Sequence, residues 1–164
     1  MTKLKHILLL VALFAAIPAF AQEGEPKLPV PRFVSLRAAE VNVRTGPGLK
    51  YPVDWIYTRK GMPVEVVAEY DTWRKLRDWD GAEGWVHQSM LSGRRSVMIM
   101  GAARAIRREA NAGGRIVAKL EPGVTAELLK CRDSWCEVSA PGGYDGWLER
   151  SGLFGVYSDE KIEE

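Results

Sequence analysis

An internal repeat constrains the fold of this chain more than any other feature of its sequence. When 62 is added to the residue numbers from Gly61 to Leu91, the chain matches itself without a gap. The identical pairs are Gly61 and Gly123, Glu65 and Glu127, Asp71 and Asp133, Trp73 and Trp135, Gly81 and Gly143, Gly84 and Gly146, Trp85 and Trp147, Ser89 and Ser151, and Leu91 and Leu153. Upstream, one inserted residue aligns Val43-Arg44 with Ile106-Arg107. A match this dense indicates two copies of one structural unit.

Each copy consists of short β-type segments separated by turn residues. In the first copy the pattern predicts strands at Glu40–Arg44, Val53–Tyr57, Pro63–Glu69, Trp73–Arg77 and Gly84–His87, a single helical turn at Gln88–Leu91, and a closing strand at Val97–Met100. No segment after the first 21 residues sustains the 3.6-residue apolar period of a helix. Short strands with frequent turns are typical of a small barrel. The sequence therefore predicts an all-β fold whose two units pack against each other.

The motifs of the repeat resemble those of the bacterial SH3-like (SH3b) family. The motifs are Val41-Asn42-Val43-Arg44-Thr45-Gly46-Pro47-Gly48 with Tyr51-Pro52-Val53, then Lys60-Gly61, Trp73 and Glu83-Gly84-Trp85-Val86. The stretch from Glu83 to Arg95 resembles a variant found in small exported proteins of Gram-negative bacteria. The resemblance implies two tandem small SH3-like β-barrels, at 33–100 and 101–157, that act as targeting or interaction modules. The second copy has Glu109-Ala110-Asn111-Ala112 where the first has Gly46-Pro47-Gly48-Leu49, which argues against a shared ligand groove there.

The first 21 residues have the three parts of a cleaved signal peptide. A basic start is followed by an apolar run at Ile7–Ile17 and by Ala19-Phe20-Ala21 before Gln22. The run is about half of the roughly 20 residues that span a bilayer, so a membrane anchor is disfavoured. We expect export to the periplasm, a linker at 22–32 and a disordered acidic tail at 158–164. No integral membrane segment is expected in the mature chain.

The charge of the mature chain argues against nucleic acid as a partner. The full chain has 23 basic and 21 acidic residues, and cleavage removes Lys3 and Lys5, which leaves no net charge. Nucleic-acid binding needs a strong positive field. The arginines near the junction of the two units, among them Arg94 and Arg95, could bind an anionic polymer or lipid headgroups, but a solvated face is the interpretation we favour.

The two cysteines, Cys131 and Cys136, predict a disulfide. An even pair in an exported chain is typically bonded. A metal pair would need further ligands, and the mature chain has one histidine, His87. The repeat aligns the cysteines with Glu69 and Arg74, on either side of a tight turn. We therefore expect a cross-strand disulfide in one copy and an ion pair in the other, and no metal or other cofactor.

The sequence gives little support for catalysis, and no catalytic residue is predicted. His87 and Ser89 are close in the chain, but no oriented carboxylate or oxyanion hole accompanies them. Asp78, Asp80 and Glu83 cluster in a loop, where carboxylates are usually solvated and not set across a cleft as glycoside hydrolysis requires. The sequence therefore favours a protein that is not an enzyme.

Aromatic residues present in only one copy are the candidates for ligand binding. They are Tyr51, Trp55, Tyr57 and Trp79; Gly114, Ala118 and Pro141 stand opposite Tyr51, Trp55 and Trp79 in the second copy. Trp55 and Tyr57 alternate on one strand face, which predicts that they are adjacent. Aromatic side chains grip extended peptides well. Alternatively, these residues form the interface between the two units, and both interpretations stay open.

The leading functional hypothesis is non-catalytic binding in the cell envelope. The expected ligand is a peptidoglycan peptide or an envelope protein. One alternative is an accessory or assembly factor that regulates an envelope enzyme without affinity for the wall. A small cell-wall hydrolase is a further alternative of low weight.

Overall fold

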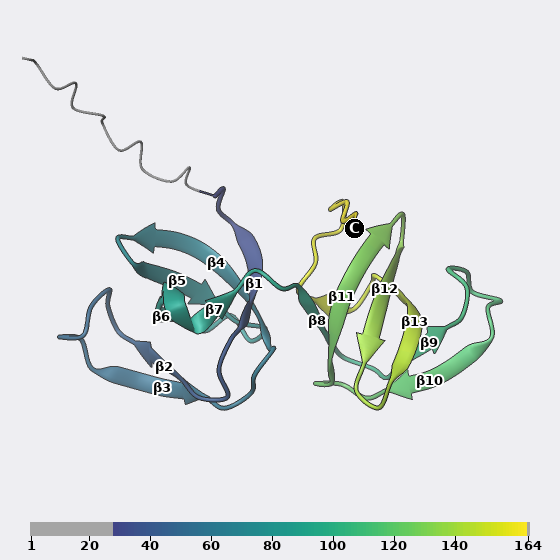
Figure 1. The fold of residues 1–164 in the computed structure, drawn as a ribbon, viewed down its shortest axis with the longest axis horizontal. Coiled ribbons are helices and arrows are strands. Elements are labelled where there is room, and N and C mark those ends of the chain that lie inside the picture. The colour runs from purple at the N-terminus through teal and green to yellow at the C-terminus, as the bar shows by residue number, and fades with distance from the viewer. Residues whose placement is uncertain (1–27, 164) are drawn as a thin grey trace, which may run out of the picture.

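The structure, a computed structural model, describes residues 28–163. The expected signal peptide at 1–21 lies outside the described residues. Two all-β units follow one another along the chain, as the repeat predicts (Figure 1). Within residues 28–163, no helix has the length and hydropathy needed to cross a membrane.

The first unit is a seven-stranded antiparallel sheet. Its elements are β1 (Arg32–Leu36), β2 (Val41–Arg44), β3 (Val53–Tyr57), β4 (Pro63–Tyr70), β5 (Trp73–Arg77), β6 (Glu83–His87), the 3₁₀ turn η1 (Gln88–Met90) and β7 (Leu91–Ser92). The strand order is β3-β2-β6-β5-β4-β1-β7. The strands predicted at Val53–Tyr57 and Trp73–Arg77 have the predicted bounds.

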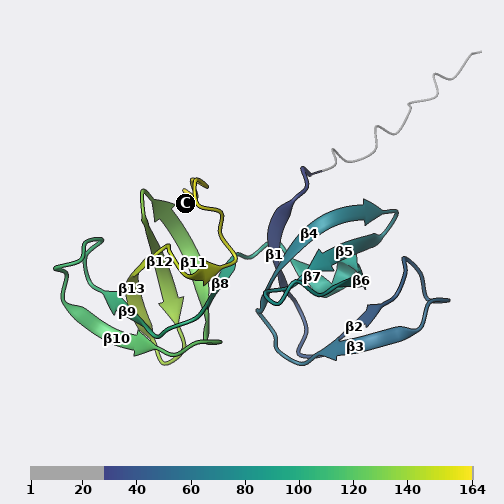
Figure 2. The ribbon, with the colours of Figure 1, turned by 180° about the vertical axis from the view of Figure 1, so that it is seen from behind.

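The second unit repeats this topology. Its strands are β8 (Ser96–Ile99), β9 (Arg104–Arg107), β10 (Ile116–Leu120), β11 (Thr125–Arg132), β12 (Trp135–Ala140), β13 (Tyr144–Glu149) and β14 (Leu153–Phe154). The order β10-β9-β13-β12-β11-β8-β14 is that of the first unit, with every strand moved on by seven. The predicted all-β fold with two tandem units is confirmed. Seen from behind, the two units again lie side by side, joined through β8 (Figure 2).

The strand predicted at Val97–Met100 does not close the first barrel, and this prediction was wrong. Residues 96–99 form β8, which pairs with β11 through Val97 and Ala126 and with β14 through Ile99 and Leu153. In the first unit the corresponding place between β4 and β7 is taken by β1. Residues 96–99 are thus the first strand of the second unit.

Two of the residue pairs shared by the two copies serve backbone geometry. Asp71 and Asp133 have φ values of 50° and 49° in the turns that join β4 to β5 and β11 to β12. Gly84 and Gly146 lie where another strand crosses closely: a Cβ would collide with Val43 at the first position and with the Arg107 carbonyl at the second. Matching local geometry at equivalent positions explains why the repeat keeps these residues.

Each unit has its own apolar core, as a small barrel requires. The first core contains Leu36, Val41, Val43, Val64, Val66, Leu76 and Val86. The second contains Val97, Ile99, Ile106, Leu128, Cys136, Val138 and Leu148.

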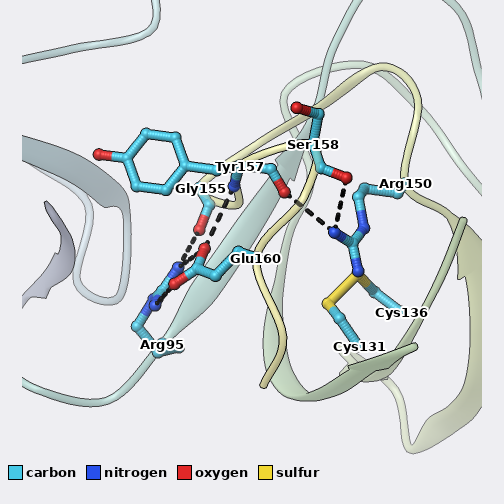
Figure 3. Close-up of a disulfide and its surroundings, with 8 residues drawn as sticks. All are labelled: Arg95, Cys131, Cys136, Arg150, Gly155, Tyr157, Ser158 and Glu160. Carbon is cyan, nitrogen blue, oxygen red and sulfur yellow. Dashed lines mark hydrogen bonds and ion pairs between the residues drawn. A yellow bond between two sulfur atoms is a disulfide. The ribbon is translucent and has the colours of Figure 1, made fainter. Parts of the chain in front are cut away.

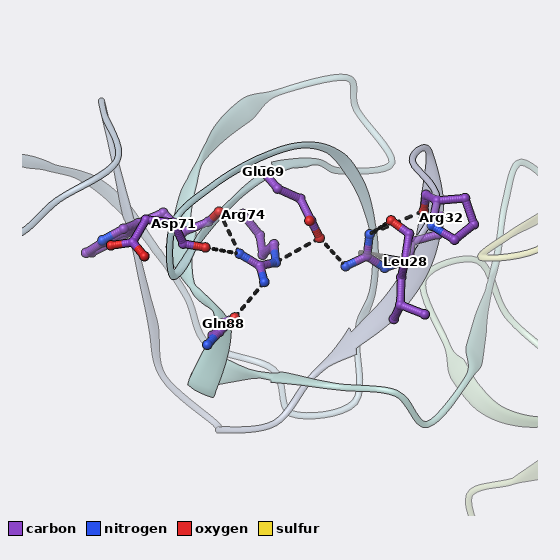
Figure 4. A network of polar contacts seen from close by, with 8 residues as sticks. Leu28, Arg32, Glu69, Asp71, Arg74 and Gln88 are labelled. Atoms are coloured by element: carbon purple, nitrogen blue, oxygen red, sulfur yellow. Dashed lines mark hydrogen bonds and ion pairs between the residues drawn. The ribbon is translucent and has the colours of Figure 1, made fainter. Parts of the chain in front are cut away.

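The predicted disulfide is confirmed in the second unit (Figure 3). Cys131 and Cys136 are direct cross-strand partners, with their Cα atoms 4.1 Å apart. In the first unit Glu69 and Arg74 occupy the same register. Arg74 Nε lies 3.0 Å from Glu69 Oε1, which confirms the expected ion pair. Arg32 binds the same oxygen at 2.5 Å and ties β1 into the pair (Figure 4).

The two units are in contact, as expected, through a small aromatic cluster. The ring of Phe33 in β1 lies 5.1 Å from that of Phe154 and 4.7 Å from that of Tyr157, centroid to centroid. A hydrogen bond of 2.6 Å from Arg59 to the Gly123 carbonyl also joins the units.

The segment 158–164 was expected to be a disordered acidic tail, and for its described part this expectation was wrong. Glu160 forms an ion pair of 2.6 Å with Arg95 (Figure 3). The amide of Cys131 donates a hydrogen bond of 2.9 Å to the Ile162 carbonyl. Arg95, in the connection between the units, and the Cys131 amide of the second unit therefore anchor a segment whose charges alone suggested solvation.

Candidate binding site at the domain junction

Three of the four candidate aromatic residues form one continuous group. The rings of Trp55 and Tyr57 are 6.0 Å apart in an edge-on arrangement, which confirms that they are adjacent on β3. The ring of Trp79, from the loop between β5 and β6, lies 6.4 Å from that of Tyr57. The group therefore extends from the face of β3 to a loop that the sequence does not place beside it.

Asp78 holds this aromatic group in place. The Tyr57 hydroxyl donates a hydrogen bond of 3.0 Å to Asp78 Oδ2, and the amides of Asp80 and Ala82 donate to Oδ1 at 3.0 and 2.9 Å. Asp78 is buried, so the expectation of a solvated loop carboxylate was wrong for this residue. Burial raises the pKa of Tyr57, and the charge of Asp78 and the hydrogen bond to it raise it further. Tyr57 therefore stays protonated and remains the donor.

Tyr57 and Trp79 of this group line a cavity of about 530 Å³ between the two units, whereas Trp55 does not reach it. The cavity walls are mostly apolar and come from both units: Ile56, Tyr57, Thr58, Arg59, Met62 and Trp79 from the first, and Met98, Ile99, Met100, Gly101, Pro122 and Gly123 from the second. Trp79 and Ile56, which line this cavity, are 41% and 51% exposed. We call this space the aromatic pocket.

Tyr51 lies apart from this group. Its ring covers Gly46, where a Cβ would come within 2.5 Å of the ring, and Lys50 lies 5.3 Å from its centroid. Within residues 28–163, no ring contact joins Tyr51 to the other three aromatic residues. The structure thus brings together Trp55, Tyr57 and Trp79 but not Tyr51.

The methionines of the aromatic pocket were not among the sequence candidates. Met98 and Met100 belong to the second unit and line the same cavity as Met62 only because the units pack together. No pattern within one copy of the repeat predicts this shared cavity. The one signal in the sequence is that Met62, Met98 and Met100 have no methionine at the equivalent positions of the other copy.

The surroundings of His87 are those of a structural side chain. Its Nδ1 lies 2.7 Å from Ser89 Oγ, and its ring packs edge-on against Trp73 at 5.5 Å. No carboxylate among residues 28–163 makes a hydrogen bond to it. Within the same residues, no group of three or more His, Cys, Asp or Glu side chains is placed to hold a metal ion.

Comparison with solved structures finds similarity over most of the chain. The chain is similar to NlpC2 from Trichomonas vaginalis, with 12% identity and a TM-score of 0.37 over 82% of this chain and 52% of that one. It is similar to NlpC1 from the same organism, with 14% identity and a TM-score of 0.36 over 85% of this chain and 50% of that one. The chain thus spans about half the length of these two proteins. A search of curated proteins found no match.

A family model shows which family the two units represent. The model described as bacterial SH3 domain matches the chain twice, over residues 37–93 and over residues 101–155. The first match runs from the end of β1 to just beyond β7, and the second from just before β9 to just beyond β14. Together the matches cover more than half of the chain, and each spans six of the seven strands of one sheet, β2–β7 in the first and β9–β14 in the second. The protein belongs to the bacterial SH3 domain family and carries two copies of the domain in tandem.

Proposed function

We propose that the protein is a non-catalytic binding module of the cell envelope that recognises a peptide. The peptide belongs either to peptidoglycan or to an envelope protein, and the protein meets it in the periplasm after export. Membership of the bacterial SH3 domain family supports this proposal, because such domains typically act as binding modules. The proposal assigns no bond-breaking step to the chain.

The aromatic pocket is the observation that carries the proposal. Its volume of about 530 Å³ lies in the range of small-ligand sites. Trp79 offers a stiff apolar surface at the edge of the pocket, and the methionines on the opposite wall can adapt to different side chains. A pocket with one rigid aromatic wall and one adaptable wall suits an extended peptide with an apolar side chain.

The proposal also explains why two domains occur in tandem, because residues of both domains line the pocket. The first domain supplies the aromatic side chains, while Met98, Met100 and Pro122 of the second domain form the opposite wall. A single domain would leave Trp79 and Ile56 on an open surface. Two docked domains therefore make a pocket that neither makes alone.

Co-sedimentation with purified peptidoglycan sacculi tests the proposal. We compare the wild type with Trp79→Ala and with Tyr70→Ala as a matched control. Tyr70 is 63% exposed at the end of β4 and lies outside the pocket, so both substitutions remove an exposed ring. We expect the wild type and Tyr70→Ala to sediment with sacculi and Trp79→Ala to stay in solution.

A second readout separates the two kinds of peptide. If sacculi retain none of the proteins, crosslinking in the periplasm should join the wild type and Tyr70→Ala, but not Trp79→Ala, to one envelope protein. That outcome identifies an envelope protein as the ligand and favours the accessory role. Binding that does not depend on Trp79 in either assay would refute the pocket as the binding site. Release of soluble wall fragments by the wild type but not by His87→Ala would refute the non-catalytic role.

A further inference from the structure

A second cavity at the domain junction has a different chemical character from the aromatic pocket. Its volume is about 630 Å³. Four cationic side chains and one carboxylate line it: Arg37, Lys60, Arg94, Arg95 and Glu127. Serine, threonine and apolar residues complete the walls. We call this space the basic cavity.

Most of the positive charge of the basic cavity has no acidic partner in the part of the chain that the structure describes. Arg95 is paired with Glu160 and also donates a hydrogen bond of 2.8 Å to the Gly155 carbonyl. Arg37 donates to the Leu91 carbonyl at 3.0 Å and forms no ion pair with a described residue. The side chains of Lys60 and Arg94 make no hydrogen bond or ion pair within residues 28–163. Glu127 alone does not balance these three cations.

Two buried hydroxyls of the basic cavity also have no hydrogen-bond partner. They are Ser96 Oγ and Thr125 Oγ1. The Nε of Arg95 is also buried without a hydrogen-bond partner. These are three of the six buried side-chain atoms without a partner among the described residues. Ser96 is only 6% exposed. Buried polar groups are nearly always bonded, so two unbonded hydroxyls on residues that line one cavity favour a ligand there that offers hydrogen-bond acceptors.

The fold itself does not require these hydroxyls. The strand registers place Ser96 opposite Glu127 and, in the first domain, Phe33 opposite Glu65. Thr125 likewise corresponds to Pro63, which pairs with Ser35 as Thr125 pairs with Met98. Apolar residues therefore occupy the equivalent positions of the other copy. The hydroxyls of Ser96 and Thr125 are specific to the basic cavity.

We propose that the basic cavity binds a small ligand through an oxyanion, either a carboxylate or a phosphate. Hydroxyl groups and cationic side chains are donors, and a ligand that satisfies them must bring several acceptor oxygens and negative charge. Arginine suits both groups, because its planar guanidinium matches their paired oxygens. Leu36, Ala126, Ala140 and Pro141 give the same cavity an apolar wall for an aliphatic part of the ligand. This site is separate from the aromatic pocket and does not depend on peptide recognition there.

Titration followed by NMR tests the proposal on the full purified protein. Inorganic phosphate and acetate are added in separate experiments at constant ionic strength, with chloride as the reference anion. At least one of the two should cause saturable shifts of the backbone amides of residues 94–96 and 125–127. Phosphate alone would identify a phosphate ligand and acetate alone a carboxylate ligand. No saturable shift with either would overturn the proposal.

Variants distinguish specific binding in the basic cavity from a general attraction of anions to the positive charges of the protein. Lys60→Gln with Arg94→Gln should weaken binding at least tenfold. The matched control, Lys119→Gln with Arg108→Gln, removes two exposed cations of the same kinds outside the cavity and should leave the affinity unchanged. Equal losses in the two double variants would overturn the proposal, because the shifts would then report net charge.

Ser96→Ala provides an independent readout. Without ligand, it removes a buried hydroxyl that has no partner, so the unfolding midpoint should stay the same or rise. With ligand, it should weaken binding severalfold, because one donor is lost. Unchanged affinity in Ser96→Ala would overturn the role of the hydroxyls in binding.

Discussion

The hydroxyl of Tyr157 donates a hydrogen bond of 2.8 Å to Glu65 Oε1. Tyr157 follows the last strand of the second domain, and Glu65 lies in β4 of the first, so this bond crosses the junction. Arg77 holds the other carboxylate oxygen, with Nη2 at 2.7 Å from Oε2. Burial raises the pKa of Tyr157, and the hydrogen bond to Glu65 and the charge of that carboxylate raise it further. Tyr157 is therefore a permanent donor across the junction in the physiological pH range.

Replacing Tyr157 with phenylalanine should weaken the junction and leave both barrels intact. Hydrogen bonds to charged groups contribute about 1.5–3 kcal/mol, and Glu65 keeps its bonds to Arg77, so we expect a loss of about 1–2 kcal/mol. Urea unfolding of the wild type and of Tyr157→Phe measures it. Tyr70→Phe is the control, because the exposed Tyr70 hydroxyl has no hydrogen bond in residues 28–163. Equal stability of Tyr157→Phe and the wild type would contradict a role for this bond.

Gly84→Ala should be strongly destabilising, because the strand that crosses Gly84 leaves no room for a side chain. The added methyl would collide with Val43, which is fully buried in the core of the first domain, and it would lie 3.3 Å from the Arg44 carbonyl oxygen. Overpacking of this kind costs about 1–3 kcal/mol. Gly93→Ala is the control, since no atom lies within 4 Å of the position of its Cβ. A thermal unfolding scan in which the two variants match would contradict the close approach.

The sequence was sufficient to predict most strands because each has a local cause. The bounds of β3 and β5 follow from apolar alternation and from turn residues such as Asp71, whose positive φ the structure confirms. The assignment of residues 96–99 failed for a reason that is not local. All four residues of β8 are buried, and a strand buried on both faces has the same pattern in either sheet. Only its pairing with β11 decides to which domain it belongs.

The candidate site was predictable only where neighbours in sequence are neighbours in space. Trp55 and Tyr57 share a strand face, so their contact followed from the alternation. Trp79 joins them because Asp78 folds the loop back onto Tyr57, and no pattern in the sequence shows that bond. The methionines line the pocket because the two domains pack together. The sequence pattern of one copy of the repeat does not predict how the domains pack.

Loss of the disulfide should destabilise the second domain. Closing the short loop between Cys131 and Cys136 contributes about 2 kcal/mol in the chain-entropy model. Cys131→Ala with Cys136→Ala should therefore unfold at a lower urea concentration than the wild type. Addition of a reductant should shift the wild type to the position of the variant and leave the variant unchanged. A variant as stable as the oxidised wild type would show that the bond adds nothing.

The first domain should accept the same crosslink at the equivalent register. Glu69 and Arg74 pair as Cys131 and Cys136 do, and both turns contain an aspartate of nearly identical φ. Glu69→Cys with Arg74→Cys should therefore form a second disulfide on oxidation. Mass spectrometry of the digested, alkylated protein measures this. Free thiols at both positions after oxidation would show that the two turns differ in geometry.

The contact between Glu160 and Arg95 should make the anchoring of the C-terminal segment sensitive to acid. Burial raises the pKa of Glu160, but the hydrogen bonds from Arg95 and from the Tyr157 amide outweigh this, and the pKa lies below its ordinary value. A carboxyl group whose pKa is lower in the folded state stabilises that state above its unfolded pKa, about 4.3 for glutamate. This stabilisation is lost as the pH falls from there through the folded pKa.

Glu160→Gln should therefore be less stable than the wild type at pH 7, and the difference should shrink as the pH falls below about 4. Urea unfolding at a series of pH values measures the difference. Asp159→Asn is the control, because the exposed side chain of Asp159 makes no bond in the described part of the chain and its loss should have no effect at any pH. If the difference between Glu160→Gln and the wild type stayed constant from pH 7 to pH 3, the charge of Glu160 would not be its cause. The contact with Arg95 would then act through its shape alone, and the C-terminal segment would stay anchored in acid.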